Sequence, residues 1–226
     1  MKSLLRRCQC RDGKYLLQEN NRYCSFLDYT FATMTISSHR IIIITAPSGA
    51  GKTSITKHLL KTFPDKLVFS ISAATRQKRS YEKEGVDYYF MSVDDFKEKI
   101  QHNAFVEWEM VYEGKYYGTL KSEIHRIWKE EKVPLLDIDV KGAVHVQQQH
   151  PEHSLSIFIE PPSVDELKRR LHGRGTESPE SLATRLNKAT YELSFKDHFD
   201  KVIVNDDLEK ACKEAEMIVR AFIEGS

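Results

Sequence analysis

The sequence feature that most constrains the fold is an apolar run followed at once by a glycine-containing turn and a helical pattern. Isoleucine occupies positions 41–44, and apolar residues recur at helical spacing at Ile55, Leu59 and Leu60. The turn between them reads Ala46-Pro47-Ser48-Gly49-Ala50-Gly51-Lys52-Thr53. In such a unit, backbone N–H groups converge on phosphate oxygens, the lysine reaches the β- and γ-phosphates, and the threonine hydroxyl binds Mg²⁺. We therefore predict a phosphate-binding loop (P-loop) at residues 46–53.

This loop departs from the usual pattern G-x-x-x-x-G-K-[ST] at its first position, where Ala46 replaces glycine. The alternative is an ordinary strand-to-helix turn with an incidental lysine. However, a lysine at the positively polarised start of a helix is unfavourable unless an anion neutralises it. Lys52 therefore favours a bound phosphate.

From His39 onward, β-branched apolar runs alternate with helical patterns, which predicts an α/β domain with a parallel core sheet. The expected strands are residues 40–45, 67–72, 133–139, 154–159 and 201–204. The expected helices include residues 53–63, 93–101, 121–131, 163–170 and 208–223. A chain of 226 residues suits one such domain with smaller inserts.

Two segments depart from this alternation. Residues 73–120 contain short strands rich in Tyr, Phe and Trp, at 87–91 and 105–111, and they predict an insert with a small mixed sheet. Residues 173–186 are polar and poor in apolar side chains, which predicts a mobile segment.

Near the end of the strand expected at 133–139, Asp137 and Asp139 can hold Mg²⁺ through water, although an aspartate there can equally be a structural cap.

The composition limits the classes of binding partner that we expect. The chain has 34 basic and 33 acidic residues, so no overall field draws it to nucleic acid or to an anionic membrane. The sequence contains no apolar stretch of the roughly 20 residues that span a bilayer and no apolar signal-peptide core, so we expect a cytoplasmic protein. The sequence does not indicate whether it is a monomer or a homo-oligomer.

Residues 1–38 lack sustained periodicity and are interpreted as an N-terminal extension, either disordered or an artefact of the start site, since Met34 lies shortly before the first strand. A targeting segment is the alternative, which Asp12 and Glu19 argue against. Cys8 and Cys10 do not have the spacing of a zinc site.

Residues 69–79 contain the pattern S-x-x-T-R-x-x-R, from Ser72 to Arg79, which resembles a signature of the guanylate kinases. Later blocks also resemble that family, in order and with near-matching spacing: 85–90, 105–108, 116–119, 136–139 and 202–207. The resemblance covers residues 39–226. It implies a three-layer P-loop NTPase fold with a GMP-binding insert at about 73–120 and a mobile lid at about 171–190. Alanine in place of the first P-loop glycine is also familiar in the family.

The resemblance implies phosphoryl transfer from ATP to GMP or dGMP, giving ADP and GDP, with Mg²⁺ as cofactor. It implies that the GMP phosphate is bound by Arg76, Arg79, Tyr88 and Tyr117, and that the base is bound by Ser72, Glu107, Thr119 and Asp139. The chemistry agrees, because guanidinium forks suit a phosphate dianion and a carboxylate accepts from the adjacent N–H donors of guanine. Tyr116 is an alternative to Tyr117, because the link from Glu107 is one residue longer than expected.

On the ATP side, the resemblance implies that Arg170, Arg174 and Arg185 act on the transferring phosphoryl group together with Lys52, and that Asn205 contacts adenine. Thr53 and Asp137 would hold Mg²⁺, partly through water. Two other functions stay open: a guanylate kinase-like module that binds proteins without catalysis, and a related P-loop kinase with another phosphorylated acceptor. A non-catalytic module is expected to lose P-loop and lid residues, which this chain retains.

Overall fold

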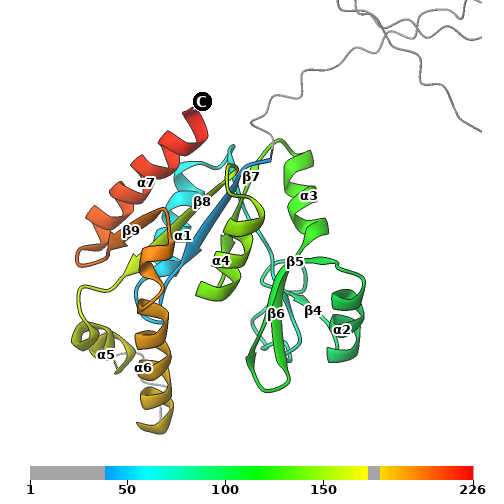
Figure 1. The fold of residues 1–226 in the computed structure, drawn as a ribbon, viewed down its shortest axis with the longest axis horizontal. Coiled ribbons are helices and arrows are strands. Elements are labelled where there is room, and N and C mark those ends of the chain that lie inside the picture. Colours follow the sequence, from blue (N-terminus) through cyan, green and yellow to red (C-terminus); the bar gives the residue numbers. More distant parts are fainter. Residues whose placement is uncertain (1–38, 173–178, 226) are drawn as a thin grey trace, which may run out of the picture. The chain divides into compact units, whose positions relative to one another are not determined.

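The computed structural model describes residues 39–172 and 179–225, which form two β-sheets (Figure 1). The larger sheet has five parallel strands in the order β2-β7-β1-β8-β9. These strands are β1 (Ile41–Thr45), β2 (Leu67–Phe69), β7 (Val133–Asp137), β8 (Ser154–Glu160) and β9 (Lys201–Val204). The P-loop therefore leaves the sheet from its central strand.

Helices cover both faces of this sheet, which explains the unbroken isoleucine run of β1. Successive side chains of a strand point to opposite faces. Ile42 and Ile44 pack in one cluster and Ile41 and Ile43 in the other, and all four are fully buried. Burying one such side chain stabilises the fold by about 1.5–3 kcal/mol. A strand covered on both faces is apolar throughout, as parallel strands of three-layer folds are.

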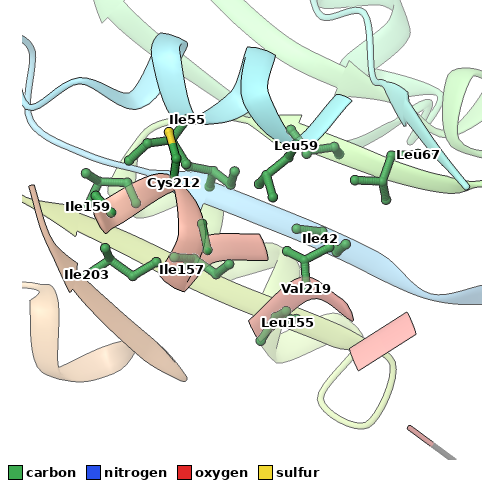
Figure 2. Packing of buried hydrophobic residues seen from close by; sticks show 14 of the residues in the cluster. Ile42, Ile55, Leu59, Leu67, Leu155, Ile157, Ile159, Ile203, Cys212 and Val219 are labelled. Carbon is green, nitrogen blue, oxygen red and sulfur yellow. The ribbon is translucent and has the colours of Figure 1, made fainter. Parts of the chain in front are cut away.

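The two faces are covered by different helices. The first cluster contains residues of α1 (Lys52–Thr62) and α7 (Leu208–Glu224), and Figure 2 shows Leu59 of α1 and Val219 of α7 packed around Ile42. The second cluster contains residues of α3 (Lys121–Lys129) and α4 (Val140–Gln149). The result is a helix, sheet and helix arrangement in three layers.

The smaller sheet has the strand order β4-β3-β6-β5 and belongs to the segment between β2 and α3. Its elements are β3 (Ala73–Ala74), β4 (Tyr89–Phe90), α2 (Val93–Gln101), β5 (Phe105–Tyr112) and β6 (Lys115–Leu120). A separate hydrophobic cluster supports it, in which the rings of Phe96 and Phe105 stack at 4.3 Å. This insert therefore has its own core.

Beyond β8, α5 (Val164–His172) and α6 (Pro179–Leu193) pack together through Leu167, Leu171 and Ala189. The same two leucines lie against the P-loop, since a Cβ built on Gly49 would meet their side chains at 3.0–3.1 Å. After α6, a short 3₁₀ helix, η2 (Lys196–His198), leads to β9.

The predicted α/β class, with a parallel core sheet and a small mixed sheet, is confirmed. Several element bounds differ from the prediction. The strand expected at 67–72 ends at Phe69, and the strand expected at 133–139 ends at Asp137. The prediction included neither α4 nor β6, and it assigned no helix to Pro179–Leu193, the range of α6.

The predictions for residues 1–38, for Cys8, Cys10 and Arg174, and for residues 173–178 fall outside the described residues. None of the helices in the described part of the chain is long and apolar enough to cross a membrane.

Candidate active site

The P-loop depends on two glycines. Gly49 (φ 96°) and Gly51 (φ 99°) adopt the left-handed region, which other residues rarely enter. A Cβ at Gly51 would also overlap the side-chain amide of Asn205, just after β9. That amide donates to the carbonyl oxygen of Ala50 at 2.7 Å and is buried. The path of the loop is therefore fixed by its glycines and by a residue from another strand.

Lys52 is the first residue of α1, and its ammonium group lies beside the end of β7. Its Nζ is 2.5 Å from Oδ1 of Asp137 and donates to the carbonyl oxygen of Ile138 at 3.3 Å. β1 and β7 are parallel neighbours, so their carboxyl ends meet at one edge of the sheet, where ligands bind in open α/β sheets. Thr53 follows in the first turn of α1 and is exposed.

A cleft of about 400 Å³ opens at this edge, between the P-loop and the insert. It brings together residues of the P-loop, of β5 and β6 and of the end of β7. The lining residues are Ser48, Lys52, Ser72, Tyr88, Glu107, Glu109, Val111, Tyr117, Gly118, Asp137, Ile138 and Asp139. Both halves of the predicted nucleotide site therefore face one cavity.

Glu107 is the buried carboxylate of this cleft, with 6% of its surface exposed. It lies directly opposite Thr119 in the antiparallel pairing of β5 and β6, and the Thr119 hydroxyl donates to its Oε1 at 2.7 Å. Burial raises the pKa of Glu107 to about 7, the neighbouring charge of Asp139 adds to this rise, and the bond from Thr119 opposes it.

The approach of Glu107 to α4 requires a glycine. A Cβ built on Gly142, in the first turn of α4, would lie 2.6 Å from Oε2 of Glu107. Asp139 caps this helix, since its Oδ1 accepts from the Gly142 backbone nitrogen at 2.9 Å. The capping role considered for Asp139 is thus observed, and its side chain also lines the cleft.

Arg76 is held in place by Glu82, a residue that the sequence analysis did not single out. The guanidinium donates two hydrogen bonds to this carboxylate, at 2.6 and 2.5 Å, and lies 4.8 Å from the ring centre of Tyr88. Glu82 is itself buried, and chiefly through its hydrogen bonds from Arg76, its pKa falls to about 2. The two bonds to Glu82 thus fix the position of the Arg76 guanidinium beside the cleft.

The structure places Tyr117, and not Tyr116, in the cleft. Tyr117 lies 6.0 Å from Tyr88 between ring centres, whereas Tyr116 packs in the cluster of Phe96 under the small sheet. The pairing of β5 with β6 shifts register between Met110 and Tyr112, next to the turn. A second shift lies between Phe105 and Glu107, and between the two shifts β5 and β6 pair in register, with Glu107 opposite Thr119.

Three of the predicted arginines that the structure describes, Arg79, Arg170 and Arg185, do not line the cleft. Arg79 is exposed, and its guanidinium donates to the Tyr81 hydroxyl at 2.9 Å. Arg170 donates to the carbonyl oxygen of Asn205 at 3.0 Å and pairs with Glu166. Arg185 of α6 reaches Oγ of Ser48 at 3.5 Å. Arg170 and Arg185 thus lie at the edge of the P-loop, and the side-chain amide of Asn205 is bonded to the P-loop itself.

Some cleft residues were missed by the sequence analysis. Glu109 and Val111 line the cleft because they alternate with Glu107 along β5, and this period of two could have identified them. Glu82 gives no such signal, because it stands in a charged loop where only the folded contacts distinguish it.

The guanylate kinase family model matches residues 38–222 of this chain. The chain belongs to the guanylate kinase family. A guanylate kinase of Bacteroides fragilis is 46% identical over 184 residues, covering 81% of this chain and 90% of the relative. A guanylate kinase of Salinibacter ruber is 46% identical over 183 residues, covering 81% and 96%.

A solved structure agrees with these relatives. The crystal structure of guanylate kinase from Anaplasma phagocytophilum has a TM-score of 0.64 and 31% identity, covering 82% of this chain and 86% of that one. The guanylate kinase family match includes the P-loop, the insert, α5, α6 and all the residues that line the cleft.

Proposed function

We propose that this chain is an ATP:GMP phosphotransferase that converts ATP and GMP, or dGMP, to ADP and GDP, or dGDP. The observation that carries the proposal is the cleft that Lys52 and Glu107 both line. A phosphate-binding lysine and a buried carboxylate thereby face the same space. This arrangement suits a donor phosphate and an acceptor purine held together for direct transfer.

The acceptor base is assigned to the Glu107 end of the cleft. Guanine has adjacent N1–H and N2–H donors, which an ionised carboxylate accepts together. The Thr119 bond holds the carboxylate in place. Adenine carries an acceptor at N1, so a carboxylate would face a lone pair. Ser72 and Asp139 line the same space and complete the proposed base contacts.

The acceptor phosphate is assigned to Arg76, Tyr88 and Tyr117, which lie side by side at the cleft. A guanidinium fork and phenolic hydroxyls donate to the oxygens of a phosphate dianion. Arg79 also belongs to the proposed set. Its exposed guanidinium, which donates to the Tyr81 hydroxyl, would reach the phosphate by rotation about its side-chain torsions.

The donor is assigned to the P-loop. Backbone N–H groups of residues 46–53 bind its phosphates, and Lys52 neutralises charge that develops during transfer. One hydroxyl, of Thr53, and one carboxylate, of Asp137, fit Mg²⁺, which is commonly held by one or two protein oxygens plus substrate phosphates and water. When bound, Mg²⁺ supplies charge neutralisation at the β- and γ-phosphates.

In the proposed transfer, an oxygen of the GMP phosphate attacks the γ-phosphorus in line and the bond to the ADP oxygen breaks. A phosphate dianion carries no proton to remove, so the step needs no general base. Arg185 and Arg170, at the rim of the loop, and Arg174 are the proposed cations that offset the charge of the transferred group.

The decisive experiment is a coupled assay of ADP release with GMP, dGMP, AMP and UMP as acceptors. We expect turnover of GMP and dGMP, and discrimination against AMP of up to about 10⁴-fold. Lys52→Ala is expected to abolish turnover while the circular dichroism spectrum is retained. AMP turnover comparable with GMP turnover would refute the base assignment, and full activity of Lys52→Ala would refute the P-loop assignment.

The same assay separates the two alternatives. A non-catalytic protein-binding module would release no ADP with any acceptor. A related kinase would release ADP only with a different phosphorylated acceptor. The retained P-loop lysine argues against a non-catalytic module, and the buried carboxylate of the cleft favours guanine over an acceptor without adjacent N–H donors.

A further inference from the structure

A buried carboxylate outside the cleft joins the insert to the helix that follows it. Glu123 lies in the first turn of α3, and 1% of its side chain is exposed. Its two oxygens together accept four hydrogen bonds. Oε1 accepts from the Ile71 backbone nitrogen at 3.1 Å and from Arg126 Nη2 at 2.8 Å, and Oε2 accepts from the Tyr89 hydroxyl at 2.9 Å and from Arg126 Nε at 2.9 Å.

Two of these donors are the immediate neighbours of cleft residues. Ile71 precedes Ser72, and Tyr89 follows Tyr88, and both Ser72 and Tyr88 line the cleft. The two donor segments are also bonded to each other, since the Tyr89 backbone nitrogen donates to the Ser72 carbonyl oxygen at 2.9 Å. Glu123 thus holds the backbone on which one base contact and one phosphate contact are mounted.

The charge state of this cluster is well defined. Burial works against ionisation of Glu123, but the hydrogen bonds from Arg126, Ile71 and Tyr89 outweigh it and hold its pKa below the usual range. Burial, together with the Glu123 carboxylate, raises the pKa of Tyr89, so its hydroxyl keeps the proton that it donates. A buried carboxylate with four donors is costly to replace, because a neutral group leaves donors unpaired.

We propose that Glu123 is a positioning residue for the acceptor nucleotide, setting the places of Ser72 and Tyr88 through its bonds to Ile71 and Tyr89. This inference rests on the proposed function. Glu123 itself does not line the cleft, so it acts through its neighbours. Its loss therefore affects the acceptor and leaves the P-loop, which lies on the other side of the cleft, in place.

The test is Glu123→Gln, with Michaelis constants measured for GMP and for ATP. Glutamine keeps the size but offers one acceptor oxygen in place of two, so the Arg126 fork meets an N–H₂ group on one side. We expect the KM for GMP to rise about tenfold and the KM for ATP to change less than about twofold. Equal rises for both nucleotides, or no rise for GMP, would overturn the inference.

Two further variants make the result specific. Tyr89→Phe removes one donor to Glu123 and leaves the ring in its cluster, so we expect a smaller rise in the KM for GMP that is not additive with Glu123→Gln. Glu130→Gln, at the C-cap of the same helix, removes only the negative charge from the exposed pair that Arg126 Nη1 forms with Glu130, at 2.7 Å, and is expected to leave both Michaelis constants unchanged.

Failure of this inference can be distinguished from failure of the proposed function. Wild-type protein that does not phosphorylate GMP would refute the function itself. If Glu123→Gln fails to fold, Tyr89→Phe decides, since an unchanged KM for GMP in that variant overturns the inference.

Discussion

The carboxyl group of Glu107 is buried, yet its proposed role requires a negative charge. Because the folded-state pKa is raised to about 7, the group is ionised above that pH and protonated below it. Only the ionised form accepts both guanine donors. We therefore predict that kcat/KM for GMP rises with pH up to about 7 and then levels off, since this parameter reports the free enzyme.

The phosphate of GMP titrates in a similar pH range, with a pKa of about 6. A control must therefore shift the pKa of Glu107 without shifting that of the substrate. The Thr119 bond lowers the pKa of Glu107. Thr119→Val should therefore shift the break in the profile to higher pH, while the titration of the substrate stays fixed. A break at the same pH in both proteins would contradict the assignment to Glu107.

At the scale of elements, the end of β9 supports the P-loop through Asn205. Asn205→Ala removes its bond to Ala50 and leaves a buried carbonyl oxygen without that donor, at a cost of about 1–3 kcal/mol. We predict a lower melting temperature, a higher KM for ATP and an unchanged KM for GMP. Asn187→Ala, at an exposed position of α6, is the matched control and should change none of these.

A second phosphoryl donor, GTP, distinguishes support of the P-loop by Asn205 from contact of Asn205 with adenine. If Asn205 only supports the loop, the KM for GTP as phosphoryl donor rises by the same factor as the KM for ATP. A rise confined to ATP would instead favour the adenine contact that the family resemblance implies.

The elements differ in how well the sequence predicts them, for physical reasons. β1 is predictable because both its faces are buried, so the run of isoleucines is unbroken. α4 was missed because Gly142, which costs about 1 kcal/mol relative to alanine in a helix, interrupts the apolar pattern. That glycine is explained only by the contact with Glu107, which lies 35 positions earlier and joins it through folding.

Within the site, motif residues were predictable and their supports were not. Lys52 was identified from the P-loop pattern and Glu107 from the resemblance to the guanylate kinases, and both line the cleft. Glu82 and Glu123 act through partners brought together by the insert, so a sequence read locally gives them no distinguishing mark.

For the whole molecule, the predicted domain starts after the N-terminal extension. The hydrophobic clusters in the described part of the chain are formed by residues from Ile41 onward, and the family match begins at residue 38. We predict that deletion of residues 1–33 leaves the melting temperature and the turnover of GMP unchanged. Loss of folding or of turnover in the shortened chain would show that the extension contributes to the structure.

The register shift between Met110 and Tyr112 separates the paired part of the β5 and β6 hairpin from its turn. Hydrogen bonds between the two strands fix the pairing of Glu107 with Thr119, whereas the turn at Glu113 and Gly114 lies outside this paired region. We expect single-residue insertions or deletions at the hairpin tip to leave the pairing of Glu107 with Thr119, and with it the proposed purine contact, unchanged. The length of the hairpin tip is thus free of the constraint that the proposed base contact places on the strands.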